Sequence, residues 1–280
     1  MFYGYLPFYF VVRKLRGYRP QPVTYASLKN WIEQFEKDDR KHLLSLLKHV
    51  IYLNESETRR RLVSQNRILL ERLEQSGIES TNIIYIQIDE AGSSSPLMLN
   101  MLKEAAFLER RGCRFLDNKD VLGLNKLTNK LEQGAIIYID DFVGTGNQFC
   151  ESRDFLIEHV VGTFSEFLIA PCVCEEAIYE LGKRGVESRS EHVHLKGERP
   201  LHANCTRFKD SIKKRLIELA MQIDPKWGLG YKNLASMVVL YRNAPNGVPL
   251  LLRGNVGQNP YKGILPRTQD FLPPPILIGE

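Results

Sequence analysis

Cysteine is scarce in this sequence. The chain has five cysteines among 280 residues, an odd number without the spacing of a disulfide framework. Secreted domains held by disulfides carry an even number at regular spacing, so we expect a reducing compartment and predict the cytoplasm as the location. Cys172/Cys174 and His192/His194 are each spaced by two residues, like side chains on one face of a strand. We interpret both pairs as strand residues; a zinc site, which needs four converging ligands, is the alternative.

Long apolar runs are also missing. No window of the sequence approaches the length that a membrane-spanning helix needs. The apolar and aromatic stretch at residues 2–12 is interrupted by Gly4 and Pro7, and its basic residues follow it from Arg13 onward. A secretory signal has the opposite order. We therefore expect no signal peptide and no membrane association.

The signatures of several function classes are absent. The sequence contains no Ser-His-Asp order, no metal-hydrolase motif, no aromatic-rich nucleic-acid motif and no internal repeat. Its apolar content of 43% is normal for a folded chain. A length of 280 residues fits one large domain, or one domain with an appendage.

The net charge is +5, and basic residues gather at two places. These clusters are Arg59, Arg60, Arg61, Arg67 and Arg72, and Lys213, Lys214 and Arg215. Both clusters fall on predicted amphipathic helices, where a solvated face is the simpler interpretation. A phosphate-rich partner such as nucleic acid is the alternative.

The pattern of apolar residues changes near residue 77. Residues 27–77 carry apolar residues at helical spacing and end at Gly77, so we assign residues 1–77 to an N-terminal helical extension. Residues 78–280 form the second predicted part, with strands at 83–88, 134–139, 164–170, 186–195 and 235–241 and helices at 96–111, 148–160, 175–184 and 208–223. This alternation predicts an α/β fold, with a mostly parallel sheet and helices on both faces.

One segment of the second part is especially informative. An apolar run, Ala135–Ile139, predicts a buried strand that ends at two adjacent carboxylates, Asp140 and Asp141. A small-residue loop leads from the carboxylates into a predicted helix, through Phe142, Val143, Gly144, Thr145, Gly146, Asn147 and Gln148. Ligands of parallel sheets bind beyond the carboxyl ends of the strands, and this loop is expected at such an end.

The loop and the carboxylates suit two halves of one ligand. Glycines let backbone N–H groups approach a phosphate, and the helix N-terminus behind them favours an anion. The two carboxylates can accept hydrogen bonds from ribose hydroxyls, or they can hold a divalent metal ion. A ribose 5-phosphate satisfies both halves. The alternative is an ordinary strand-to-helix turn with a solvated pair of aspartates.

This segment resembles the fingerprint of the type I phosphoribosyltransferases, in which an apolar strand precedes two acidic residues, two apolar residues and a Thr-rich loop. Two positions depart from the fingerprint. Gly144 stands where Thr or Ser is usual, and Gln148 replaces the last Thr, which bonds the 5-phosphate. The resemblance implies that Asp140 and Asp141 are catalytic and bind Mg²⁺, and that residues 142–148 bind phosphoribosyl pyrophosphate.

A second loop is expected at the same edge of the sheet. Predicted strand 83–88 is followed by residues suited to anion binding before a helix begins, namely Gly92, Ser93, Ser94 and Ser95. Serine-rich capping of the helix is the alternative. The segment resembles, by position and chemistry, the loop that holds pyrophosphate in type I phosphoribosyltransferases.

Shorter motifs are similar to a divergent group, the phosphoribosyltransferase-like proteins of bacterial conflict and phage-defence systems, including some retrons. These motifs lie at residues 31–35, 228–231, 243–247 and 265–267. The resemblance implies a defence effector that transfers or releases a phosphoribosyl group, with a reverse transcriptase and nucleic-acid complex as partner. The alternative function is a catalytically silent nucleotide-sugar sensor or regulatory subunit in such a complex.

Overall fold

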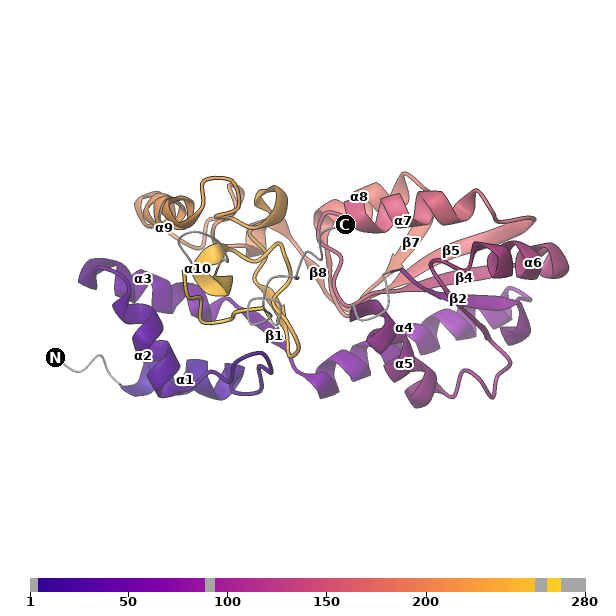
Figure 1. The fold of residues 1–280 in the computed structure, drawn as a ribbon, viewed down its shortest axis with the longest axis horizontal. Coiled ribbons are helices and arrows are strands. Elements are labelled where there is room, and N and C mark those ends of the chain that lie inside the picture. The colour runs from indigo at the N-terminus through magenta and orange to yellow at the C-terminus, as the bar shows by residue number, and fades with distance from the viewer. Residues whose placement is uncertain (1–4, 89–93, 255–260, 268–280) are drawn as a thin grey trace, which may run out of the picture. The chain divides into compact units, whose positions relative to one another are not determined.

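The computed structural model describes residues 5–88, 94–254 and 261–267. The chain forms two compact units (Figure 1). Unit 1 combines Met1–Asn54 with Lys196–Glu280, and unit 2 is Glu55–Leu195. The boundary expected at residue 77 therefore falls inside unit 2, just after helix α4 (Glu55–Gln75). The difference arises because α4 packs on elements of unit 2, while the last third of the chain joins the N-terminal helices in unit 1.

Unit 2 is built on a sheet of five parallel strands. The strands are β2 (Ile83–Gln87), β3 (Arg114–Asp117), β4 (Gln133–Ile139), β5 (Thr163–Ile169) and β7 (Val186–Arg189). Their order is β3-β2-β4-β5-β7. The central strand, β4, is buried from Gly134 to Ile139, as a strand covered on both faces must be.

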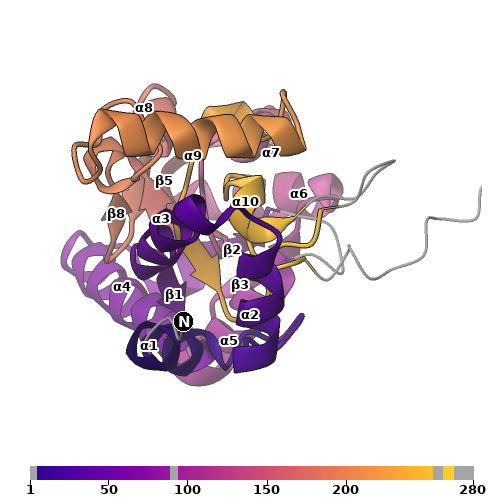
Figure 2. The same ribbon diagram turned by 90° about the vertical axis from the view of Figure 1, so that its left-hand side faces the viewer.

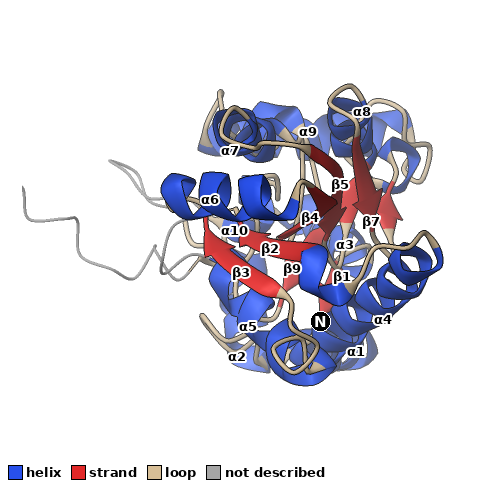
Figure 3. Ribbon diagram, turned by 90° about the vertical axis from the view of Figure 1, so that its right-hand side faces the viewer, coloured by secondary structure: helices blue, strands red, loops and turns tan. Residues whose placement is uncertain are grey.

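Helices cover both faces of this sheet (Figure 3). The helices are α5 (Ser94–Ala106), α6 (Val121–Leu131), α7 (Asn147–Ile157) and α8 (Glu175–Gly182), with a short helix η1 (Ser80–Asn82) before β2. Alternate side chains, such as Ile84, Ile136 and Leu168, pack in one core with α6, α7 and α8. Helices α4 and α5 lie on the other face, against each other and against β2, β4 and β5. The predicted α/β fold is confirmed.

Unit 1 is mainly helical (Figure 2). Its helices are α1 (Tyr5–Leu15), α2 (Tyr25–Glu33), α3 (Lys37–Lys48), α9 (Asp210–Ile223), α10 (Leu250–Arg253), η2 (Lys196–Glu198) and η3 (Tyr231–Asn233). Strand β1 (Ile51–Leu53) pairs in parallel with β9 (Val238–Leu240). One hydrophobic core joins both parts of the chain in this unit, with Trp31, Leu47, Leu216 and Leu251 among its buried residues.

Cys174 and His194 are opposite each other in a small parallel pair, β6 (Val173–Cys174) and β8 (Val193–His194), as the strand interpretation expected. Cys172 and His192, the other members of the two pairs, lie directly before these strands and not in them. Within residues 5–88, 94–254 and 261–267, no helix is both long enough and apolar enough to cross a bilayer.

Candidate functional site

The strand order places a reversal between β2 and β4. From β2 the chain moves outward to β3, and it then returns past β2 to β4, β5 and β7. Because all five strands are parallel, their carboxyl ends meet at one edge of the sheet. Open α/β sheets bind ligands at that edge, where the strand order reverses. The segments that follow β2 and β4 therefore flank the expected binding site.

The acidic pair follows β4 directly at this reversal. The Asp140 side chain is largely buried, and its backbone N–H donates to the carbonyl of Ile169 in β5 at 3.2 Å. One carboxylate oxygen of Asp140 accepts the backbone N–H of Asp141 at 2.7 Å. Asp141 is half-buried. The sheet thus extends one residue past β4 and fixes the acidic pair at its carboxyl edge.

The loop after the acidic pair is anchored to β6. The N–H of Val143 donates to the carbonyl of Cys172 at 3.4 Å, and the N–H of Cys174 donates to the carbonyl of Val143 at 2.8 Å. These two bonds form a parallel bridge between Val143 and Val173. Val143 is buried, whereas Phe142 and Gly144 are half-buried. The loop is held at its middle before it turns into α7.

Gly146 begins helix α7 in a conformation that favours glycine. Its φ is +80°, in the left-handed region, and a Cβ at this position would lie 3.3 Å from the Cα of Ala177 in α8. Gly146, the N-cap residue, has no side chain to cap α7, and the hydroxyl of Thr145 accepts the N–H of Asn147 at 3.5 Å. Gln148 is exposed. The first turn of α7 therefore presents backbone N–H groups at the loop, as an anion site requires.

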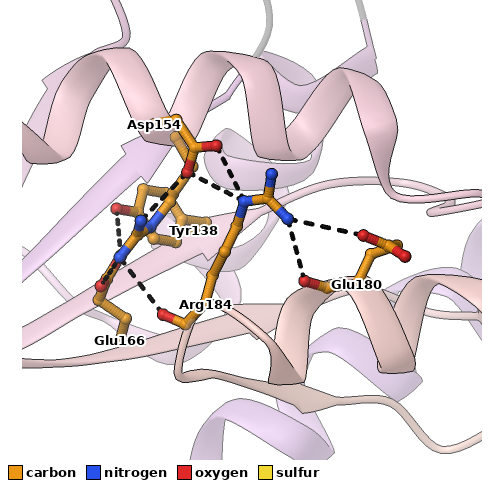
Figure 4. A network of polar contacts seen from close by, with 6 residues as sticks. Tyr138, Asp154, Glu166, Glu180 and Arg184 are labelled. Carbon is orange, nitrogen blue, oxygen red and sulfur yellow. Dashed lines mark hydrogen bonds and ion pairs between the residues drawn. The ribbon is translucent and has the colours of Figure 1, made fainter.

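A buried ionic network holds α7 on the sheet (Figure 4). Arg153 of α7 binds both carboxylate oxygens of Glu166 in β5, one of them from Nε at 2.8 Å. The hydroxyl of Tyr138 in β4 donates to the same carboxylate at 2.9 Å. Burial, together with the neighbouring carboxylate, raises the pKa of Tyr138 well above its usual value, so the phenol stays protonated. Hydrogen bonding to Glu166 likewise raises the pKa of Arg153.

The network continues to α8. Arg184 donates from Nε to both oxygens of Asp154 at 3.0 and 2.9 Å, and it lies 3.6 Å from a carboxylate oxygen of Glu180 (Figure 4). Burial opposes the ionisation of Asp154, but hydrogen bonds from Arg184 and Arg153 lower its pKa below the ordinary value. The contacts join β4, β5, α7 and α8, so they fix the helix whose N-terminus faces the candidate site.

The second predicted loop is described only at its end. Gly92 and Ser93 lie outside the described residues, as does the side chain of Ser94. Ser95 is fully buried, and its hydroxyl accepts the N–H of Ile88 at 3.0 Å and donates to the carbonyl of Ile139 at 2.5 Å. Its hydroxyl therefore joins the ends of β2 and β4 at the strand reversal. This geometry gives Ser95 a scaffold contact that the serine-rich pattern did not reveal.

Asn118 is a residue at this edge that sequence analysis missed. It follows β3, and its amide nitrogen donates to the carbonyl of Ile88 at 2.8 Å. The amide oxygen is buried and has no partner among the described residues. The polar residues 117–120 could have indicated a loop at the sheet edge. Because β3 was not predicted from the sequence, these residues could not be assigned to the end of a strand.

The basic clusters are mostly engaged within the chain. In α4, four arginines pair with acidic residues of unit 2: Arg60 with Glu57 and Glu191, Arg61 with Glu57, Arg67 with Glu71, and Arg72 with Glu187. In α9, Lys213 donates to the carbonyls of Ala203 and Cys205, and Arg215 binds Asp39. A solvated helix face is the simpler interpretation of these clusters from the sequence, and the structure adds that four arginines of α4 have acidic partners within the chain.

Comparison with known proteins assigns the family. The family model PRTase-CE matches residues 28–267. The chain belongs to the PRTase-CE family. The match of this PRTase-CE chain begins within the residues that we assigned to an N-terminal extension, so most of those residues belong to the family's common region.

Other comparisons add little to this assignment. No curated protein matches the PRTase-CE chain. Among solved structures it is similar to the crystal structure of orotate phosphoribosyltransferase from Aeropyrum pernix, with 15% identity and a TM-score of 0.31. That similarity covers 45% of this chain and 67% of the other. The fold assignment therefore depends on the strand order and the family match.

Proposed function

We propose that this chain is an enzyme that binds phosphoribosyl pyrophosphate and Mg²⁺ at the strand reversal and transfers or releases the phosphoribosyl group. A phosphoribosyltransferase-like function agrees with the family and the fold. The observation that carries the finer proposal is the position of Asp140 and Asp141, directly before the loop and the N-terminus of α7.

The loop and α7 suit the 5-phosphate of the donor. The first turn of a helix has N–H groups without partners inside the helix, and its dipole favours a negative charge. Gly146 allows the tight entry into α7, and Thr145 adds a hydroxyl beside it. Gln148, exposed in the same first turn, can donate through its amide where the type I fingerprint has a threonine.

The acidic pair suits the ribose. Carboxylates accept hydrogen bonds, so Asp140 and Asp141 can hold two neighbouring ribose hydroxyls. Breaking the bond between C1 and the pyrophosphate oxygen leaves positive charge on the ribose ring. Fixed negative charge at the sheet edge stabilises that charge as it develops. An acceptor, which is water in the simplest case, forms the new bond at C1 and loses its proton to solvent.

The same residues fit Mg²⁺ by their chemistry. Mg²⁺ prefers oxygen ligands and is commonly held by one or two carboxylates together with substrate phosphates. Asp140 and Asp141 supply two carboxylates on consecutive residues. The hydrogen bond from the Asp141 N–H to Asp140 is compatible with a bound cation, because a carboxylate has about four lone-pair sites. Bound Mg²⁺ would neutralise charge on the departing pyrophosphate.

Release of pyrophosphate tests this proposal. The purified chain is incubated with phosphoribosyl pyrophosphate and Mg²⁺, with water as acceptor and then with free bases. We expect release by the native chain and none by the double variant Asp140→Asn/Asp141→Asn. A native chain that binds the donor without releasing pyrophosphate under any of these conditions would contradict the enzymatic proposal and favour the sensor.

The proposed role in phage defence, with a reverse transcriptase and nucleic acid as partners, is independent of that assay. It is supported by the motifs at residues 31–35 and 243–247. Because arginines of α4 pair with acidic side chains of the same chain, we expect the nucleic-acid contact to lie on another surface. Phage restriction by cells that carry the complete system should be lost with Asp140→Asn/Asp141→Asn at normal expression. Full restriction by that variant would contradict a catalytic effector.

A further inference from the structure

A concave site lies within unit 1, in a different unit from the acidic pair. It is a cavity of about 410 Å³ bounded by the ends of α1 and α3, by β1, by η2 and by the segment before α9. The lining residues are Lys14, Lys48, His49, Val50, Ile51, Tyr52, Glu198 and Arg207. Binding pockets for small molecules have volumes of about 300–1,000 Å³, so this cavity has the size for a nucleotide or a sugar phosphate.

The lining is strongly cationic. It carries Lys14, Lys48 and Arg207, against Glu198 as the one carboxylate among its described residues. None of the three cations has a carboxylate within 4.0 Å among the described residues. Elsewhere in the chain, the arginines of α4 pair with acidic side chains. The three cations of the cavity therefore lack the carboxylate partners that the arginines of α4 have.

Lys14 and Arg207 are held at the cavity by contacts with the end of α3 and the residue after it. The ammonium of Lys14 donates to the carbonyl of Lys48 at 3.2 Å, at the C-terminus of α3, where the helix dipole favours a cation. The guanidinium of Arg207 lies 3.4 Å from Nδ1 of His49. The His49 ring packs edge-on against Phe208, with centroids 5.5 Å apart. Three chain segments thus bring nitrogen donors to one place.

From this arrangement we infer that the cavity binds a small molecule with a phosphate monoester, through Lys14, Lys48 and Arg207, at a site separate from the acidic pair. Lysine and arginine form strong charge-assisted hydrogen bonds to phosphate. Apolar and aromatic surface from Val50, Ile51 and Tyr52 lies beside the cations and suits the rest of such a ligand. A dianion would also relieve the repulsion among the three cations.

His49 provides a reporter for the site. Burial, followed by the charges of Arg207, Lys14 and Lys48, lowers its pKa below the ordinary value. A bound phosphate dianion counters those charges, so the pKa of His49 should rise when phosphate is added. The other titratable groups that face the cavity are Tyr52, whose pKa burial raises to about 12, and Glu198. Tyr52 stays protonated across the range in which His49 titrates.

The experiment uses the full chain with inorganic phosphate and with 5′-AMP as probes. Calorimetry measures affinity, and the proton resonances of His49, assigned with His49→Gln, give its pKa with and without phosphate. We expect binding of both probes, tighter for 5′-AMP, and an upward shift of the pKa of His49. Arg207→Ala and Lys48→Ala should each weaken binding about tenfold or more, whereas Lys214→Ala, an exposed lysine of α9, should leave it unchanged.

Two results would overturn the inference. One is the absence of binding by either probe, or binding that is as tight in the Arg207→Ala variant as in the native chain. The other is binding of a DNA or RNA duplex that depends on Lys48 and Arg207 when neither small probe binds, which would make the cavity part of a nucleic-acid surface. Thermal unfolding of each variant confirms that a loss of binding is not a loss of fold.

Discussion

The network behind α7 makes the strongest prediction about stability, through the substitution Arg153→Met. Methionine retains much of the length of arginine but removes the guanidinium. Arg153 is 12% exposed and its partner Glu166 is 9% exposed. The substitution leaves the buried carboxylate of Glu166 with the hydroxyl of Tyr138 as its remaining partner in the network. A buried charge without its counterion is costly.

The magnitude follows from this burial. Removing one partner of a buried ion pair costs about 3–5 kcal/mol. The lower end applies here, because Tyr138 still donates to Glu166, and Arg184 still holds Asp154. We therefore expect the free energy of unfolding to fall by about 3 kcal/mol. The double variant Arg153→Met/Glu166→Gln should be more stable than the single variant, because the unpaired charge is gone.

Urea denaturation followed by far-ultraviolet circular dichroism measures this loss. Both tryptophans, Trp31 and Trp227, lie in unit 1, so tryptophan emission does not arise from the unit that contains Arg153. Lys183→Met is the control, because Lys183 pairs with Glu180 at the surface, where solvent screens an ion pair and its contribution to stability is small. A loss in Arg153→Met no larger than in this control, or a double variant less stable than the single one, would contradict the role assigned to the pair of Arg153 and Glu166.

Three further substitutions test other parts of unit 2. Gly146→Ala should cost about 1–2 kcal/mol of backbone strain and also weaken donor binding in calorimetry, because its Cβ would contact Ala177. Gly185→Ala is the control: Gly185 has φ +72° and no atom near its Cβ position, so this variant should show the strain without the loss of binding. Equal donor binding by the two variants would contradict the role of the close contact between Gly146 and α8. Hydrogen bonds from two arginines lower the pKa of Glu57 to about 2, so its contribution to stability is complete above about pH 4.5 and is lost as the pH falls towards 2. Glu57→Gln should remove that part of the acid titration followed by circular dichroism, and an unchanged titration would count against the pairing. Ser95→Ala should lower the free energy of urea unfolding by about 1–3 kcal/mol, because it leaves buried groups of β2 and β4 unpaired; a loss below about 0.5 kcal/mol would contradict its scaffold role.

The candidate site was largely predictable from local sequence. Strand β4 is a continuous apolar run, and the small residues after Asp141 mark its turn into α7. Helix α7 begins at Asn147, within one residue of the start expected at 148. These features were visible because the apolar run of β4, the acidic pair and the small residues of the loop are adjacent in the sequence.

The elements that were missed depend on contacts between distant residues. Strand β3 has four residues, Arg114–Asp117, with two apolar side chains and no β-branched residue, so its pattern is too weak to indicate a strand. It exists because it pairs with β2. The strand expected at 235–241 was found as β9, but its pairing with β1 joins segments far apart in the sequence. That pairing assigns the ends of the chain to one unit, which the helical pattern before Gly77 could not show.

The role of Ser95 shows the same limit within the site. A serine before a helix suggests a cap or an anion ligand. Its actual partners, the N–H of Ile88 and the carbonyl of Ile139, belong to two strands that become neighbours only through the order of the sheet. Residue type therefore predicted the location of Ser95, and the topology decided its contacts.

Calorimetric titration of the chain with phosphoribosyl pyrophosphate in the presence of Mg²⁺ tests whether the acidic pair holds the donor. We predict saturable binding that the double variant Asp140→Asn/Asp141→Asn abolishes, while its thermal unfolding stays close to that of the native chain. Asp210→Asn, a variant of a fully exposed carboxylate in unit 1, serves as the control and should bind normally. Unchanged donor affinity in the folded double variant would contradict the assignment of the site to the acidic pair.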